Sequence, residues 1–259
     1  MPVILATDET GRPAYTTETI AALVKGVGLD RVVKEDPLVV DIAAGTGKFT
    51  RSLLANLPEL VDKVPTITCV EPSELADNLE VAFGDKVKVV RAVADALPFA
   101  DGSVDIMFVA QAFHWFATEA TVAEFVRVLA PGAGLGLVWN IRQSSPWMDR
   151  LEAVLLRYYA LDPSVPRVQT GAWRARFEGV EGLAPLAHTP YPWVHETTAD
   201  GVVQMVLSIS VVSRQPEDEK ERVAAEVRAL LEELPEDMKL PGGGIAFPYV
   251  ANVYLTKRL

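Results

Sequence analysis

The chain has 259 residues, of which 49% are hydrophobic, enough to cover both faces of a parallel sheet in one large α/β domain. Its 24 lysines and arginines against 35 aspartates and glutamates give a net charge of −11, which argues against a nucleic-acid partner. No apolar run reaches membrane-spanning length, residues 2–6 lack the basic flank of a signal peptide, and the single cysteine, Cys69, excludes internal disulfides. We therefore expect a cytoplasmic protein without a membrane partner.

Five near-continuous apolar runs in the first half of the chain predict buried strands. They cover residues 38–43, 66–70, 87–91, 104–110 and 134–140. Helical patterns lie between them, as at 49–57 and 118–129. This alternation of strand and helix predicts a doubly wound α/β fold with a parallel sheet.

The pattern changes after residue 142. It predicts, in order, a helix at 147–160, a short strand at 183–189, an apolar helix at 198–212, an amphipathic helix at 216–234 and a strand at 247–256. We expect a single domain over residues 1–259. Within it, residues 32–142 form a core, 143–246 a helical cap with added helices, and 247–259 the last strand.

The first strand ends in a loop of small residues that passes directly into a helix. Gly45 and Gly47 in this loop allow backbone amides and a positive helix end to approach a ligand. A phosphate-binding loop is disfavoured, because Ile42 stands where it needs a glycine and Phe49 where it needs a hydroxyl. A dinucleotide-binding loop is also disfavoured, because Thr50 occupies the third small position.

Acidic residues follow the second and third strands. Glu71, before Pro72 and Ser73, can accept hydrogen bonds from both hydroxyls of a ribose. Asp95 lies in an Asp-Ala-Leu-Pro-Phe turn after the third strand. Alone, Glu71 is typical of a helix start and Asp95 of a turn, but together with the glycine loop they favour ligand binding.

From residue 38 to residue 142 these motifs, in this order, resemble the class I S-adenosylmethionine-dependent methyltransferases. The similarity is to small-molecule enzymes related to trans-aconitate methyltransferase, with Ala43 in place of the usual first glycine. It rests on residues 39–50, 66–74, 87–99, 103–116 and 128–134.

The resemblance implies a mostly parallel, seven-stranded Rossmann-like sheet with an antiparallel last strand. It implies S-adenosylmethionine as donor, S-adenosylhomocysteine as product, and a small-molecule acceptor with an O, S or N nucleophile, including a carboxylate. Asp95 would meet the adenine amino group. The residues expected at the cofactor are Asp41, Ala43, Gly45, Thr46, Gly47, Glu71, Pro72, Ser73, Asp95, Ala96 and Gln111.

A sulfonium donor is already electrophilic, so positioning should supply most of the rate. A base is required only for a protonated acceptor, and His114, at the predicted reactive edge, is the candidate for a base, an orienting group or a pocket wall. No metal is expected. The residues predicted to line the acceptor pocket are Tyr15, Trp115, Asn140, Arg142, Trp147 and Trp193.

Two other functions stay open on the sequence alone. One is a protein of this fold that binds S-adenosylmethionine without methylating, such as a cyclase or a regulatory partner. The other is an NAD-dependent oxidoreductase. Residues 11–15 resemble the end of the N-terminal helix that closes over the cofactor in the family, so we expect a shortened lid. We also expect a monomer or a homodimer.

Overall fold

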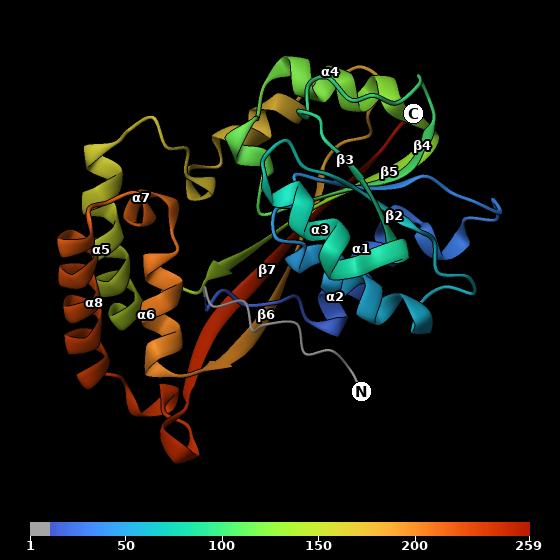
Figure 1. Cartoon of the computed structure of the whole chain (residues 1–259). Coiled ribbons are helices and arrows are strands. Elements are labelled where there is room, and N and C mark those ends of the chain that lie inside the picture. The colour runs from blue at the N-terminus through green and yellow to red at the C-terminus, as the bar shows by residue number, and fades with distance from the viewer. Residues whose placement is uncertain (1–10) are drawn as a thin grey trace. The chain divides into compact units, whose positions relative to one another are not determined.

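The structure is a computed structural model that describes residues 11–259; the apolar start at residues 2–6 lies outside the described part. All five strands predicted for the first half form (Figure 1). The strands are β1 (Val39–Ile42), β2 (Ile67–Val70), β3 (Val87–Val90), β4 (Val104–Ala110), β5 (Leu129–Arg142), β6 (Ala187–Thr197) and β7 (Ile245–Lys257). The helices are α1 (Thr17–Val27), α2 (Lys48–Asn56), α3 (Leu75–Phe83), α4 (Glu119–Val128), α5 (Pro146–Leu161), α6 (Ala199–Leu207), α7 (Ser210–Ser213) and α8 (Glu217–Glu232).

One seven-stranded sheet has the order β3-β2-β1-β4-β5-β7-β6. The pairs β3–β2, β2–β1, β1–β4 and β4–β5 are parallel, with Val39 opposite both Ile67 and Ile106. The last two strands run antiparallel, as the resemblance implied for the last strand. The strand order reverses between β1 and β4, so ligands are expected beyond the carboxyl ends of these two strands.

Apolar side chains cover both faces of the sheet. On one face α1 and α2 pack against the strands in a cluster that includes Leu23, Phe49, Leu53, Ile67 and Phe108. On the other face α4 contributes Phe125, which packs against Phe113. Helices on both faces complete the doubly wound arrangement.

The chain forms two compact units. The larger contains Ala14–Trp139, Arg167–Tyr191 and Ala251–Leu259, and the smaller contains residues 11–13, Asn140–Pro166 and Pro192–Val250. Residues 167–191, which the sequence pattern assigned to the cap, thus group with the larger unit. Strands β5, β6 and β7 each run from one unit into the other.

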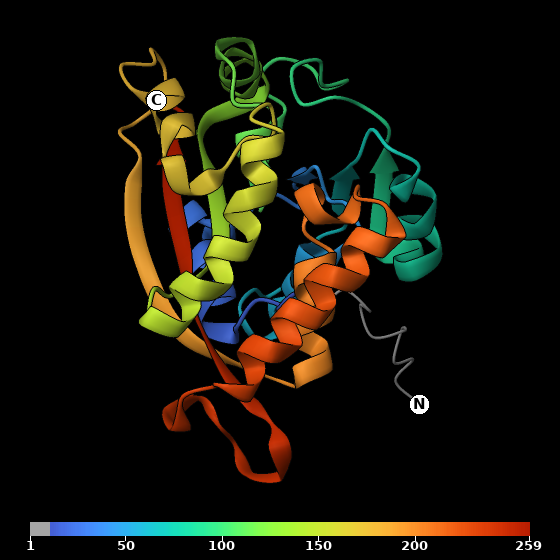
Figure 2. The ribbon, with the colours of Figure 1, turned by 90° about the vertical axis from the view of Figure 1, so that its left-hand side faces the viewer.

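The smaller unit is built on helices α5, α6 and α8, which lie side by side (Figure 2). Their apolar faces form one cluster with the inner side chains of β7, including Leu151, Val206, Val227 and Phe247. Trp147 is buried in this cluster and donates its Nε1–H to the carbonyl of Leu230 over 2.9 Å. This position gives Trp147 a packing role, and the pocket role predicted for it gains no support.

Two elements differ from the sequence prediction. The strand expected at 183–189 is wrong: Leu183 makes only an isolated bridge to Arg258, and the strand begins at Ala187. Pro190 and Pro192 argue against a strand in the sequence pattern. An edge strand tolerates proline, because the backbone N–H groups on its outer side have no neighbouring strand to bond.

The helix expected at 198–212 is divided into α6 and α7, because Ile209 between them is extended. Arg12 donates to both the hydroxyl and the carbonyl of Ser208, which satisfies the end of α6. Within residues 11–259 no helix is long and apolar enough to cross a membrane.

Candidate functional site

The loop between β1 and α2 has an unusual backbone. Gly45 has φ +56° and Gly47, the N-cap of α2, has φ +77°. Ala43 also has a positive φ, 56°, although it carries a side chain. A left-handed backbone conformation costs a residue with a Cβ about 1–2 kcal/mol. Contacts with the surrounding structure therefore hold Ala43 in a conformation that its own backbone disfavours.

The two loop glycines serve different purposes. A Cβ on Gly47 would lie 2.4 Å from the Phe83 ring and 2.8 Å from Leu79, so Gly47 lets α3 pack against the loop. A Cβ on Gly45 would meet only the Ala43 carbonyl at 4.0 Å and otherwise open space. Gly45 is therefore the glycine that leaves room for a ligand.

Glu71 joins this loop to the end of β2. Its side chain is buried, and its Oε2 accepts the Gly45 amide at 2.8 Å. Its Oε1 accepts the amide of Ser73 at 3.0 Å and the hydroxyl of Ser73 at 2.6 Å. The carboxylate thus lies beside the open space at Gly45, where it can receive hydroxyl donors from a ligand.

Asp41 lies beneath the loop with one oxygen committed. Its Oδ2 accepts the Thr50 hydroxyl at 2.6 Å, while Oδ1 is buried and has no hydrogen-bond partner in the described part of the chain. Burial and the nearby charge of Glu71 outweigh the Thr50 bond and raise the pKa of Asp41 to about 7. The neighbouring Cys69 is buried, as predicted, and burial raises its pKa to about 12, so it is an inert thiol.

A second residue with a side chain adopts positive φ at the end of the adjacent strand. Gln111, directly after β4, has φ 59°, and its amide donates to the Val138 carbonyl over 2.8 Å. Ala43 and Gln111 therefore carry unusual backbone at the carboxyl ends of β1 and β4, where the strand order reverses. Such strain is typical of functional sites.

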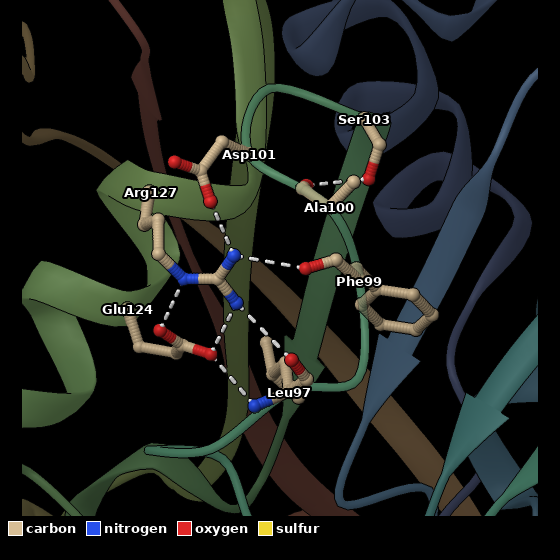
Figure 3. Close-up of polar contacts among 7 residues, drawn as sticks. All are labelled: Leu97, Phe99, Ala100, Asp101, Ser103, Glu124 and Arg127. Carbon is tan, nitrogen blue, oxygen red and sulfur yellow. Dashed lines mark hydrogen bonds and ion pairs between the residues drawn. The ribbon is translucent and has the colours of Figure 1, made fainter.

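The loop between β3 and β4 carries Asp95 and Ala96, both exposed. The pair Arg127 and Glu124 of α4 holds the following residues, Leu97 to Asp101, through a network of hydrogen bonds (Figure 3). No pattern in the sequence singled out Arg127, because three of its partners, Leu97, Phe99 and Asp101, lie 26 to 30 residues away in the chain.

His114 lies in a short turn after β4, and its surroundings decide which nitrogen carries the proton. Its Nδ1 accepts the Nε1–H of the buried Trp139 at 3.2 Å. Burial lowers the pKa of His114 to about 4, so the ring is neutral at pH 7. A neutral ring that accepts at Nδ1 carries its proton on Nε2 and presents a donor there.

The remaining predicted site residues separate between the units. In the larger unit, Tyr15 is buried edge-on to Phe49 at 5.3 Å, Trp115 is exposed beside His114, and Thr46 and Pro72 are exposed. Asn140, Arg142, Trp147 and Trp193 belong to the smaller unit. No cluster of three or more histidine, cysteine or acidic side chains that could hold a metal occurs within residues 11–259.

The strain at Ala43 predicts a stabilising substitution. Ala43→Gly should raise the free energy of unfolding by about 1 kcal/mol, because glycine adopts positive φ without the Cβ clash. Urea denaturation measures the change. The matched control is Ala44→Gly, a position without positive φ, which should lose stability; equal losses in both variants would contradict the strained loop.

The raised pKa of Asp41 predicts a pH-dependent stability. The contribution of the protonated Asp41 side chain to the free energy of unfolding is complete below the ordinary pKa of 3.8. It is lost as the pH rises through the folded-state pKa of about 7. Asp41→Asn should remove this dependence, so its stability relative to wild type should improve by about 2–3 kcal/mol between pH 5 and pH 8. The exposed Asp85→Asn serves as the control in denaturant titrations, and parallel pH profiles of Asp41→Asn and wild type would contradict the burial argument.

Comparison with known proteins agrees with this geometry. Residues 40–136 match the model of a methyltransferase domain family. An uncharacterized methyltransferase-like protein of Schizosaccharomyces pombe is 34% identical over 205 residues, covering 79% of this chain and 76% of that protein. An uncharacterized methyltransferase of Mycobacterium tuberculosis is 30% identical over 244 residues, covering 93% of this chain and 88% of its own.

Solved structures share the fold. A protein of Anabaena variabilis, assigned as a methyltransferase to an antibiotic biosynthesis pathway, superposes with a TM-score of 0.60 at 18% identity and covers 97% of this chain and 100% of its own. The YcgJ protein of Bacillus subtilis gives a TM-score of 0.52 at 21% identity, with 94% and 99% covered. The methyltransferase relatives leave the NAD-dependent alternative without support. The chain belongs to the class I S-adenosylmethionine-dependent methyltransferases.

Proposed function

We propose that this enzyme methylates a small molecule whose nucleophile is already ionised at neutral pH, a carboxylate being the best fit. The donor binds at the loop of residues 43–47, with Glu71 at the ribose and Asp95 at the adenine. When bound, the sulfonium supplies an activated methyl group, so the protein has mainly to align the acceptor and exclude water.

The observation that carries this proposal is the hydrogen bond that Nδ1 of His114 accepts from Trp139, which assigns the proton of the neutral ring to Nε2. Trp139 occupies Nδ1, and the depressed pKa keeps the ring neutral. His114 therefore offers a donor and no base, which suits an acceptor that needs no deprotonation. A carboxylate has a pKa near 4 and is ionised at pH 7, whereas hydroxyls, thiols and amines are largely protonated.

The donor assignment is supported by the fit between this chain and the cofactor. Gly45 leaves open space where a Cβ would stand, and the Glu71 carboxylate lies next to it. The Asp41 Oδ1 is a buried acceptor without a partner in the described part of the chain. These groups form a small-residue cradle with the Glu71 carboxylate and, beneath it, an Asp41 carboxyl group whose pKa is raised to about 7, which suits a ligand rich in hydroxyl and ammonium donors.

The charge and cysteine content support the remaining parts of the proposal. A net charge of −11 disfavours nucleic acid and is compatible with a small acceptor. The one cysteine is buried and unpaired, as is usual for cytosolic proteins, and we place the enzyme in the cytosol.

Removing Glu71 tests the donor site. Glu71→Ala should weaken binding of S-adenosylhomocysteine by about 1–3 kcal/mol, because charged hydrogen bonds to the ribose are lost. Isothermal titration calorimetry measures the dissociation constant. Glu74→Ala, an exposed carboxylate three residues later, should leave it unchanged. An unchanged dissociation constant in Glu71→Ala would contradict the assignment of Glu71 to the ribose.

Replacing His114 separates a donor from a base. His114→Phe should raise the KM for a carboxylate acceptor about 10- to 100-fold, as expected for loss of a hydrogen bond to a charged group. The kcat should change little, because the acceptor's negative charge falls during transfer and the bond is no stronger in the transition state.

The pH profile completes this test. With a pKa of about 4, His114 should produce no kcat limb between pH 6 and pH 8. His188→Phe, an exposed histidine elsewhere in the larger unit, is the matched control. A kcat loss of about 100-fold, with a limb near pH 6–7 that disappears in His114→Phe, would instead assign a general base.

A further inference from the structure

All five N–H donors of the Arg127 side chain are used, and four acceptor groups share them (Figure 3). Nε donates to Glu124 at 2.8 Å, and one terminal nitrogen donates to Glu124 at 2.7 Å and to the Leu97 carbonyl at 3.1 Å. The other terminal nitrogen donates to the Phe99 carbonyl at 2.9 Å and to Asp101 at 2.6 Å. Arg127 therefore ties the last turn of α4 to three residues of the β3–β4 loop.

Glu124 closes the network. Oε1 of Glu124 accepts from a terminal nitrogen of Arg127 and also accepts the Leu97 amide at 2.7 Å. The amide and the carbonyl of Leu97 are therefore both hydrogen-bonded to this pair. The backbone carbonyl of Arg127 accepts the Gly102 amide at 2.8 Å. Charge-assisted bonds of this kind are stronger than neutral ones, and the Arg127 bonds keep the pKa of Glu124 below its ordinary value.

The part of the loop that carries Asp95 has little structure of its own. Its turn contains one backbone hydrogen bond, from the Ala96 amide to the Val93 carbonyl at 3.2 Å. Asp95 and Ala96 are exposed, whereas Leu97 is buried with 4% of its surface accessible. The position of Asp95 is thus set by the anchored residue two places along the chain.

We propose that Arg127 and Glu124 are positioning residues for adenine recognition, which hold the Asp95 turn in its binding geometry before the cofactor arrives. This inference rests on the donor site proposed above. Neither side chain needs to touch the cofactor. Their effect is preorganisation: a loop ordered in advance loses less conformational entropy on binding.

Substitutions in this network can separate anchoring of the β3–β4 loop from ion pairing alone. Arg127→Lys keeps the charge, but one ammonium group cannot hold the two carbonyls and both carboxylates together. Glu124→Gln keeps an acceptor for the Leu97 amide with a weaker bond to Arg127. Asp101→Asn removes only an exposed partner that holds no loop backbone. Arg150→Gln, which removes an exposed ion pair with Glu233, controls for the loss of an arginine–glutamate ion pair elsewhere in the protein.

The experiment compares two ligands by calorimetry: S-adenosylhomocysteine and its inosine analogue, which lacks the adenine amino group. Wild type should prefer the adenine ligand about tenfold or more, since Asp95 accepts from the amino group. Arg127→Lys should lose most of this preference by binding the adenine ligand about tenfold more weakly, with a smaller change for the analogue. Glu124→Gln should fall between, and both controls should match wild type.

Hydrogen exchange adds a readout independent of affinity. Amides in residues 91–103 should exchange faster in Arg127→Lys, while those of β1 and β2 stay protected. The preference for adenine over inosine separates positioning from general destabilisation. A variant that is merely less stable would keep the wild-type ratio between the dissociation constants of the two ligands.

Three outcomes overturn the inference. Folded Arg127→Lys and Glu124→Gln that retain the wild-type preference would show that the anchor does not position Asp95. A wild type with no preference would show that the loop does not recognise the amino group. A wild type that binds neither ligand would refute the proposed donor site itself, an outcome that the variants cannot mimic.

Discussion

The hydrogen bond from the Gly45 amide to the Glu71 carboxylate connects the ends of two neighbouring parallel strands, and the rest of the site is arranged around it. It requires the left-handed backbone of Ala43 and Gly45, a close approach of α3 at Gly47, and a buried carboxylate at the end of β2. Parallel pairing of β1 with β2 and β4 provides this geometry, because it brings all three carboxyl ends to one edge.

Each acidic or histidine side chain of the proposed site is held by a neighbouring group of the protein. Ser73 fixes Glu71 through two hydrogen bonds, Thr50 fixes Asp41, Trp139 fixes the tautomer of His114, and Arg127 anchors the loop of Asp95. A site built in this way is ordered before the cofactor binds. This lowers the entropic cost of binding and suits a reaction in which alignment, rather than proton transfer, limits the rate.

Much of the fold could be predicted from the sequence, because parallel strands buried on both faces are continuous apolar runs. Glu71 could be proposed for a similar reason, since an acidic residue directly after such a run is conspicuous, and Asp95 could be proposed from the Asp-Ala-Leu-Pro-Phe turn that follows β3. The proton position of His114 could not, because it depends on Trp139, which lies 25 residues away in sequence and beside it only in the fold. The roles of Gly45 and Gly47 could not be separated either, because what each Cβ would meet depends on the packing of α3.

The central claim is that the loop after β1, with Glu71 and Asp95, binds the methyl donor. Titration of the wild-type protein with S-adenosylhomocysteine and, separately, with NADH tests it most directly. The account predicts binding of S-adenosylhomocysteine with a dissociation constant of about a micromolar or tighter, equivalent to roughly 8 kcal/mol, and no binding of NADH. Binding of NADH in preference to S-adenosylhomocysteine would contradict it.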